Sequence, residues 1–335
     1  MPSVLPHASF WRTDRDSLPA PSKVIPFAGR LGANQEFSLD EDNCTQREIL
    51  QSFPDAAPLI PWRDWLSPRH FLQPELWKAG IIEASSPSMN VRKANLKTAG
   101  SCLLIYLTCF VAIGLGRLVH TFASGPLVPS LLGGLSALLA LPLFIFATGP
   151  VSGAHLNPTI TIATFFGRLS TLPRCILYVI FQTFGGAIAG WLLRASFDSR
   201  EFIVPGCYID TSLTPARSAF AIEFTTDFAL ICLSFGVGLD PRQRAVFGPA
   251  LGPILVGVVL ALCTFFTGFS REGYTGFWIR KAGNPARCFG AMVGSRFDSY
   301  HWIHWVGPLT AAIAHGVLYF LVPPYSRGLV GVRGV

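Results

Sequence analysis

The sequence predicts an all-α integral membrane protein, a bundle of six transmembrane helices with two re-entrant half-helices arranged as an inverted repeat. Three observations predict this class. The 335 residues are 50% hydrophobic and only 13% charged, although soluble domains carry about a quarter charged residues. Six apolar runs approach the ~20 residues that a helix needs to cross ~30 Å of hydrocarbon. Two shorter apolar runs each begin with Asn-Pro.

The N-terminal part of the chain is predicted to be a polar tail, because Pro, Ser, Asp and Arg are frequent there and no helical period persists. The aromatic stretch 61–77 is compatible with a helix along the membrane interface, where Trp is favoured. A short helix packed on the cytoplasmic face is the alternative. A signal peptide is not expected, since no apolar segment follows a basic start. The hydrophilic tail then favours a cytoplasmic N-terminus, which the distribution of basic residues does not decide.

The six predicted spans are rich in Gly and Ala, which allow close helix packing where lipid supplies no hydrophobic drive. They are expected at 98–118, 128–148, 172–193, 218–239, 246–269 and 303–323.

The two shorter runs, 156–167 and 285–294, begin at Asn157-Pro158 and Asn284-Pro285. Asn is a favoured N-cap and Pro is favoured at the first helical position. Each run is therefore predicted to be a half-helix that starts inside the membrane. Non-helical backbone at that depth is tolerated only within protein or beside a water-filled cavity, so the pattern indicates a pore.

The order of elements repeats: three spans, with a half-helix between the second and the third, over 98–194 and again over 218–323. An odd number of spans in each repeat gives the two repeats opposite orientations in the membrane. If the half-helices meet head to head, their positive dipole ends repel cations at the pore centre. Asn157 and Asn284 would then offer amide donors to a passing oxygen; the alternative is that they only cap their helices.

Arg287 follows Asn284 by three residues. A fixed guanidinium in a narrow pore excludes cations and donates hydrogen bonds to a neutral solute. An Arg at membrane depth is otherwise costly, so a functional role is the default.

Both Asn-Pro segments resemble the signature motifs of the aquaporin, or major intrinsic protein, family. Residues 152–159 (Ser-Gly-Ala-His-Leu-Asn-Pro-Thr) are similar to the first motif and 283–287 (Gly-Asn-Pro-Ala-Arg) to the second. Residues 301–308 resemble the start of the sixth span, and 25–30 with 76–83 resemble the tails of fungal members. The resemblance implies a right-handed helical bundle, a homotetramer in the lipid bilayer and a passive channel without a cofactor. The pore residues that it implies are Asn157, Pro158, Thr159, Asn284, Pro285, Ala286 and Arg287.

The remaining filter positions follow from the same resemblance. Counting back from the first motif gives Ala137 on the second span, and Thr264 is the candidate on the fifth. Both are small, which suggests a wide filter. Cys288 favours water, because glycerol-conducting relatives typically have Asp after the Arg. Water is therefore the leading permeant, with glycerol, urea or hydrogen peroxide as alternatives.

Three polar residues are expected to support the re-entrant loops. The resemblance implies that Glu223 accepts hydrogen bonds from loop backbone, which agrees with the rule that buried charges need partners. Gln182 lies in the third span and is assigned the same supporting role. His155 is expected to fix the first loop and not to bind metal, since no second ligand follows at a suitable spacing.

The chain departs from the family at three places. Thr159 replaces the usual Ala. Glu83 and Gly100 are 17 residues apart, whereas relatives have three, so either the first span starts near 98 or the extra segment is a gene-model addition such as a retained intron. Both alternatives predict that Glu83 is displaced. Four extra residues also precede Asn284, and counting places Lys281 near the filter, where it would block the pore unless the loop bulges outward.

The resulting division is a cytoplasmic tail (1–83), an atypical insertion (84–99), the channel domain (100–323) and a short cytoplasmic tail (324–335). Plasma membrane is the family-level expectation for location.

Other functions are less well supported by the sequence. The cysteines in apolar runs are expected to be small buried residues: Cys102, Cys109, Cys175, Cys232 and Cys263. The net charge of +7 does not indicate nucleic-acid binding, because basic residues are scattered at segment ends. No metal-ligand cluster, phosphate-binding loop or nucleophile–base motif suggests an enzyme. A gradient-coupled transporter and a non-conducting relative of the channels remain as alternatives.

Overall fold

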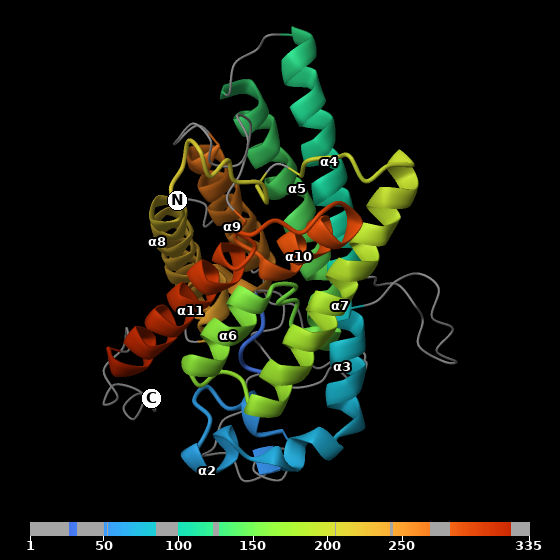
Figure 1. Cartoon of the computed structure of the whole chain (residues 1–335). Coiled ribbons are helices and arrows are strands. Elements are labelled where there is room, and N and C mark those ends of the chain that lie inside the picture. The colour runs from blue at the N-terminus through green and yellow to red at the C-terminus, as the bar shows by residue number, and fades with distance from the viewer. Residues whose placement is uncertain are drawn as a thin grey trace, which may run out of the picture.

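The computed structural model describes residues 27–31, 50–51, 53–84, 100–122, 127–204, 206–241, 244–268 and 282–322, and within these ranges it is built from helices (Figure 1). The longer ones are α3 (Pro74–Ala84), α4 (Ser101–Phe122), α5 (Leu127–Ser152), α6 (Pro158–Phe166), α7 (Leu172–Phe197), α8 (Ala216–Ser234), α9 (Arg244–Thr267), α10 (Pro285–Gly294) and α11 (Ile303–Leu321). A π-helical turn, η5 (Phe235–Leu239), continues α8. Short helical turns precede α3: η3 (Pro54–Ala56), α2 (Trp62–Trp65) and η4 (Pro68–Leu72).

The apolar runs form long helices as predicted. In the part of the chain that the structure describes, four helices are long and apolar enough to cross a membrane, at Leu127–Ser152, Leu172–Phe197, Ala216–Leu239 and Ala250–Thr267. Ser101–Arg117 of α4 is a shorter apolar helix by the same criteria. α11 has 19 residues and occupies the position of the predicted sixth span.

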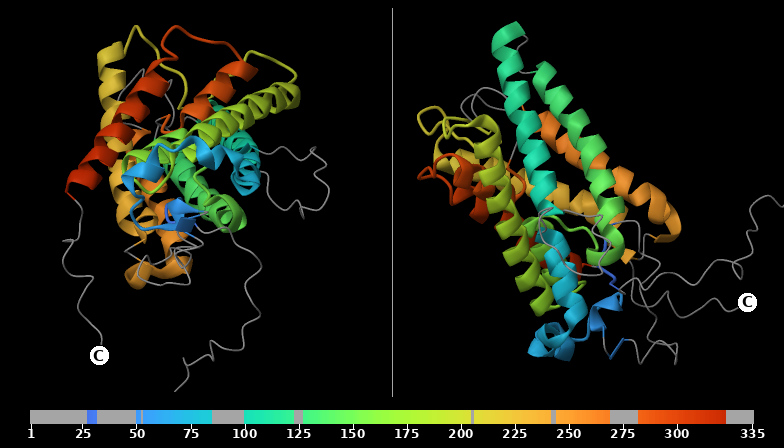
Figure 2. Two further views of the ribbon diagram at one scale, coloured as in Figure 1. Left: turned by 90° about the horizontal axis from the view of Figure 1, so that it is seen from below. Right: turned by 90° about the vertical axis from the view of Figure 1, so that its right-hand side faces the viewer.

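Two helices, α3 and α4, lie end to end in the views of Figures 1 and 2. A Cβ at Gly100 would overlap the carbonyl oxygen of Ile82 and lie 3.3 Å from that of Glu83. The chain therefore returns, after the inserted segment, to the place where it left α3. The prediction that Glu83 is displaced is wrong, because the two ends of the insertion meet and leave Glu83 fully buried in the bundle.

The two half-helices form as predicted. α10 coincides with the predicted run 285–294, and α6 lies within 156–167. Each begins with Pro directly after an Asn N-cap whose side chain accepts a backbone hydrogen bond.

The packing of the half-helices follows the inverted repeat. α6 of the first repeat packs mainly on α11 of the second, and α10 of the second packs mainly on α7 of the first. The second spans of the two repeats, α5 and α9, pack on each other. The reciprocal pattern places α6 and α10 on opposite sides of one central region (Figure 1).

Glycines allow the close approach of α7 and α10. A Cβ at Gly190 would overlap the carbonyl oxygen of Gly290, and one at Gly290 would overlap that of Gly186. The backbones touch where side chains would otherwise separate them, which is the small-residue packing expected of membrane helices.

The segments before α3 pack on one end of the bundle. Arg174 of α7 forms a buried ion pair with Asp55, with Nε 2.5 Å from Oδ2. The Trp65 indole donates to the carbonyl oxygen of Phe165 at 2.9 Å. The aromatic stretch 61–77 therefore contacts α6 and α7, and the choice between its two predicted arrangements stays open.

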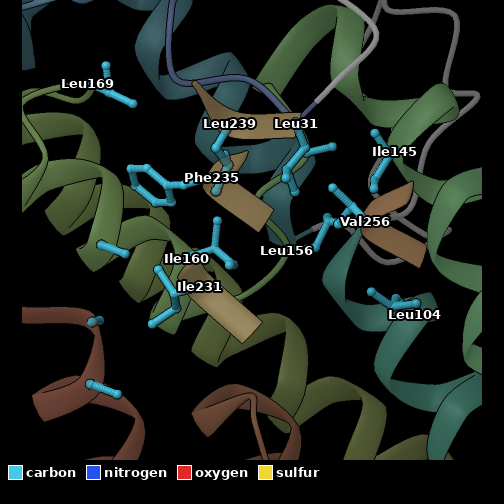
Figure 3. Close-up of a cluster of buried hydrophobic side chains, with 14 residues drawn as sticks. Leu31, Leu104, Ile145, Leu156, Ile160, Leu169, Ile231, Phe235, Leu239 and Val256 are labelled. Carbon is cyan, nitrogen blue, oxygen red and sulfur yellow. The ribbon is translucent and has the colours of Figure 1, made fainter. Parts of the chain in front are cut away.

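Buried apolar side chains from several segments form one cluster (Figure 3). Leu31, Leu156 and Val256 belong to it, and they come from the N-terminal segment 27–31, the first loop and α9. Leu31 thus reaches the interior of the bundle although it belongs to the predicted polar tail.

Candidate functional site

The two Asn-Pro motifs meet at the centre of the molecule. Asn157 donates from Nδ2 to the carbonyl oxygen of Gly283 at 2.8 Å. Asn284 donates from Nδ2 to the carbonyl oxygen of Leu156 at 3.0 Å. Each motif is therefore hydrogen-bonded to the loop that precedes the other, and the N-termini of α6 and α10 face one another.

The same Asn side chains cap their helices. Asn157 Oδ1 accepts from the Thr159 backbone N–H at 2.9 Å, and Asn284 Oδ1 accepts from the Arg287 backbone N–H at 3.3 Å. One N–H of each amide bonds the other loop and the oxygen caps the helix. Because an amide nitrogen has two N–H groups, one donor of each Asn remains beyond these contacts. Capping and a role in the pore are therefore compatible.

A cavity of about 100 Å³ lies beside the paired motifs. A water occupies about 30 Å³ of liquid volume, so the cavity has room for a few waters. It is bordered by α4, α5, α6, α8, α9, α10, the two loops and the N-terminal segment 27–31. The predicted residues that line it are Ala137, His155, Asn157, Thr264, Asn284 and Arg287. The structure thus gathers onto one cavity residues that lie up to 150 positions apart in the sequence.

The other predicted motif residues lie behind the lining. Pro158 and Pro285 occupy the first positions of α6 and α10. Thr159 is fully buried, and its hydroxyl donates to the carbonyl oxygen of Gly283 at 3.5 Å. The branched side chain that replaces the family's Ala is therefore accommodated, with its hydroxyl turned to the opposite loop. Ala286 is also fully buried, against Gly186 of α7.

The first loop, residues 153–157 between α5 and α6, is held by buried polar side chains. Glu83 Oε2 accepts from the Leu156 backbone N–H and from Gln182 Nε2, both at 2.7 Å. Leu156 has a φ of 52° and Ala154 one of 56°, a left-handed conformation that is uncommon for residues other than Gly. The carboxylate supplies a charge-assisted bond that offsets the cost of this conformation.

His155 completes the support of the first loop. Its Nδ1 lies 3.1 Å from the Thr161 hydroxyl and its Nε2 lies 2.7 Å from the carbonyl oxygen of Gly29. Both ring nitrogens are therefore engaged in hydrogen bonds. Among the described residues, no group of three or more His, Cys, Asp or Glu side chains is placed to hold a metal ion.

The second loop, of which residues 282–284 directly precede α10, is likewise held by a buried carboxylate. Glu223 accepts from the backbone N–H of Ala282 at 2.9 Å and from that of Gly283 at 3.3 Å. Its Oε1 also lies 3.3 Å from His304 Nδ1. Glu83 and Glu223 thus occupy corresponding places in the two repeats, one carboxylate for each re-entrant loop.

Arg287 lies at one end of the cavity with 8% of its surface exposed. Among the described residues that line this cavity, no other Lys or Arg and no Asp or Glu is present. Its Nη1 donates to Cys207 Sγ at 3.2 Å. Cys207 belongs to the segment between α7 and α8, which runs across the end of the bundle away from α3 (Figure 1).

Cys207 forms a disulfide with Cys288, the neighbour of Arg287. From the sequence, Cys288 is interpreted only as a small residue, and this bond is not predicted. The available signal is that both cysteines lie outside the transmembrane runs. Of the cysteines expected to be buried, Cys102, Cys109 and Cys175 are buried, whereas Cys232 is exposed and Cys263 is partly exposed.

The N-terminal segment 27–31 also reaches the site, which the sequence does not predict. The Leu31 N–H donates to the carbonyl oxygen of Gly153 at 2.9 Å, and the Leu31 side chain lines the cavity. Arg30 donates from Nη1 to the carbonyl oxygen of Gly149 at 2.7 Å. Burial lowers the pKa of Arg30 to about 9.

The predicted filter residue Lys281 lies outside the described residues.

Comparison with known proteins gives consistent matches. The profile of the major intrinsic protein family matches residues 84–319. Aquaporin-5 from Ovis aries is 33% identical over 228 residues, which cover 66% of this chain and 79% of the relative. Aquaporin TIP4-1 from Zea mays is 30% identical over 195 residues, covering 57% of this chain and 71% of the relative.

A solved structure shows the same fold. The aquaglyceroporin from Plasmodium falciparum superposes with a TM-score of 0.51 at 21% identity, covering 67% of this chain and 94% of that one. At this identity the likeness extends to the fold alone.

Proposed function

Because the chain belongs to the major intrinsic protein family, whose members are membrane channels, we propose that it conducts water passively and excludes ions and protons. The reciprocal hydrogen bonds between the Asn157 and Asn284 motifs, beside a cavity lined by both residues, carry this proposal. No cofactor and no covalent chemistry are required.

The exclusion of cations follows from the half-helices. A helix N-terminus carries a partial charge of roughly +0.5, so two facing N-termini oppose any cation between them. Each Asn amide retains one donor for a passing water, whose oxygen then accepts from the protein and not from the next water. This orientation interrupts the chain of hydrogen bonds along which protons move.

Selectivity among neutral solutes is assigned to the end of the cavity at Arg287. The guanidinium repels cations and donates to a neutral oxygen. Pro158, Thr159, Pro285 and Ala286 hold the motifs, while His155, Gln182 and Glu223 support the loops. The names of the two aquaporin relatives favour water. Ala137 and Thr264 are small lining residues, and this observation favours glycerol, urea or hydrogen peroxide as the second candidates.

The assembly and orientation belong to the same proposal. We assign the chain to the plasma membrane as a homotetramer with the N-terminal segment in the cytoplasm. Cys207 of the disulfide belongs to the segment between α7 and α8, which crosses the bundle at the end away from α3 (Figure 1), and disulfides persist outside the reducing cytosol. This supports placing that end outside.

The test is osmotic shrinkage of proteoliposomes that carry the full chain, followed by stopped-flow light scattering against empty vesicles. Faster shrinkage with a lower activation energy than the bare bilayer is expected. Uptake of glycerol, urea and hydrogen peroxide in the same vesicles decides between water and the second candidates. Solute accumulation against its gradient would instead indicate a coupled transporter. Absence of every flux from folded, inserted protein would refute the channel.

Asn157→Asp provides a sharper variant. Asp remains a good N-cap acceptor, so α6 should keep its start. The variant lacks the amide donor and adds a negative charge at the centre, so faster proton entry is expected, measured with a pH-sensitive dye inside the vesicles. An unchanged proton flux would contradict the assigned role of the amide.

A further inference from the structure

The disulfide between Cys207 and Cys288 joins two segments that are 81 residues apart in the sequence. Cys207 belongs to the segment between α7 and α8, and Cys288 lies in the first turn of α10. Both are almost inaccessible, with 4% and 0% of their surface exposed. The bond is therefore part of the protein interior next to Arg287.

Hydrogen bonds extend this link to the second loop. His304 Nε2 lies 3.1 Å from the Cys207 carbonyl oxygen, and His304 Nδ1 lies 3.3 Å from Glu223 Oε1. Glu223 in turn accepts from the N–H groups of Ala282 and Gly283. The chain then runs through Asn284 back to Cys288. These contacts and bonds close a ring, which we call the filter ring: Cys207, His304, Glu223, residues 282–287 and Cys288.

Ala282, Gly283, Asn284 and Arg287 of the filter ring line the cavity, and Arg287 is the charged residue among them. Its side chain has many rotamers, and a small shift of the guanidinium changes the width available to a solute. Two features of the ring restrict it. The neighbouring residue Cys288 is covalently linked to the segment between α7 and α8, and Arg287 Nη1 donates to the sulfur of Cys207.

We propose that the Cys207–Cys288 disulfide determines solute selectivity by positioning Arg287. Opening the disulfide removes the covalent link between the first turn of α10 and the segment between α7 and α8. The guanidinium then explores more positions, and solutes larger than water pass more readily relative to water. This inference rests on the proposed channel function.

A purely structural role makes a different prediction. A disulfide that only stabilised the fold would lower thermal stability when removed, but folded channels would keep the ratio of glycerol to water permeability. The ratio is therefore the decisive quantity.

The experiment uses the full chain in proteoliposomes. Peptide mapping without reductant first establishes the link between Cys207 and Cys288. Water and glycerol permeability are then measured on wild type, on Cys207→Ala/Cys288→Ala and on the matched control Cys232→Ala, whose cysteine is free and exposed. The double variant is expected to raise the glycerol-to-water ratio by about threefold or more, a factor that corresponds to the lower end of the coupling energies between residues of one network. The control should match wild type.

Two further variants separate the mechanisms. His304→Gln leaves the disulfide in place but alters the contact with the Cys207 carbonyl, so the ratio should rise in the same direction even if the double cysteine variant does not fold. In an Arg287→Ala background, removing the disulfide should add nothing, because the group that it positions is gone.

The outcomes are distinguishable. A wild-type chain that conducts neither water nor glycerol refutes the channel and this inference together. A conducting wild type with no mapped link, or folded variants with the wild-type ratio, refutes the inference alone. A rise that persists fully in the Arg287→Ala background also overturns it, because the disulfide would then act elsewhere.

Discussion

Deleting residues 85–98 should leave a folded and more stable channel. The deletion joins Ala84 to Ala99 and restores a spacing of three residues between Glu83 and Gly100. The structure permits this because Gly100 already lies against the carbonyl oxygens of Ile82 and Glu83. α3 and α4 would become one helix without moving Glu83 from the first loop.

The magnitude follows from the closure of the inserted loop. Closing a loop of 14 residues costs (3/2)RT ln n in chain entropy, or about 2 kcal/mol, and the deletion removes this cost. A continuous helix also pairs carbonyl and N–H groups at the two helix ends, each such hydrogen bond contributing about 1 kcal/mol. A rise of roughly 5 °C in the unfolding midpoint is therefore expected.

The assay is thermal unfolding in detergent, followed by tryptophan fluorescence at one fixed scan rate because membrane proteins commonly unfold irreversibly. Water permeability in proteoliposomes is measured alongside. Deletion of residues 90–103 is the matched control, since it removes the same number of residues but takes Gly100 and the start of α4. That control should lose the fold. A 85–98 deletion that fails to insert, or that unfolds at a lower temperature than wild type, would refute the view that α3 and α4 form one span.

Three further substitutions test other parts of the structure. Gly190→Ala should destabilise the bundle by about 1–3 kcal/mol through overpacking against α10. Gly114→Ala should be tolerated, because no neighbouring atom lies within 4 Å of its Cβ position. Equal unfolding midpoints for the two variants would contradict the packing argument. Asp55→Asn leaves Arg174 buried without its ionic partner, so a loss of about 3–5 kcal/mol is expected in the same unfolding assay, and a loss below 1 kcal/mol would count against a buried pair. Leu31→Ala shortens a side chain that lines the cavity, so water permeability per channel should rise, and an unchanged or reduced value would show that this side chain does not restrict the pathway.

Local patterns determine a large part of this protein from sequence alone. The span lengths follow from apolar runs of about 20 residues, because the thickness of the hydrocarbon sets the length of a helix. The starts of α6 and α10 follow from Asn157-Pro158 and Asn284-Pro285, because capping depends on neighbouring backbone groups. The family resemblance adds Arg287, Ala137 and Thr264, and the structure gathers these three onto the cavity.

Contacts between residues far apart in the sequence could be identified only from the tertiary structure. The spacing between Glu83 and Gly100 suggests a displaced carboxylate, yet the chain returns to its starting point and Glu83 keeps its bond to Leu156. Spacing along the sequence cannot reveal this, because the cost of closing a loop grows only slowly with its length, so distant residues can still meet.

The Cys207–Cys288 pair and the Leu31 contact have the same origin. Each joins segments whose separation in sequence carries no information on their separation in space. The sequence by itself determined the helices, the half-helices and their order, since these depend on hydropathy and on near neighbours. Only the tertiary structure decided which loops are tied together around Arg287 and which side chain of the tail reaches the cavity, because those contacts depend on the packing of the whole bundle.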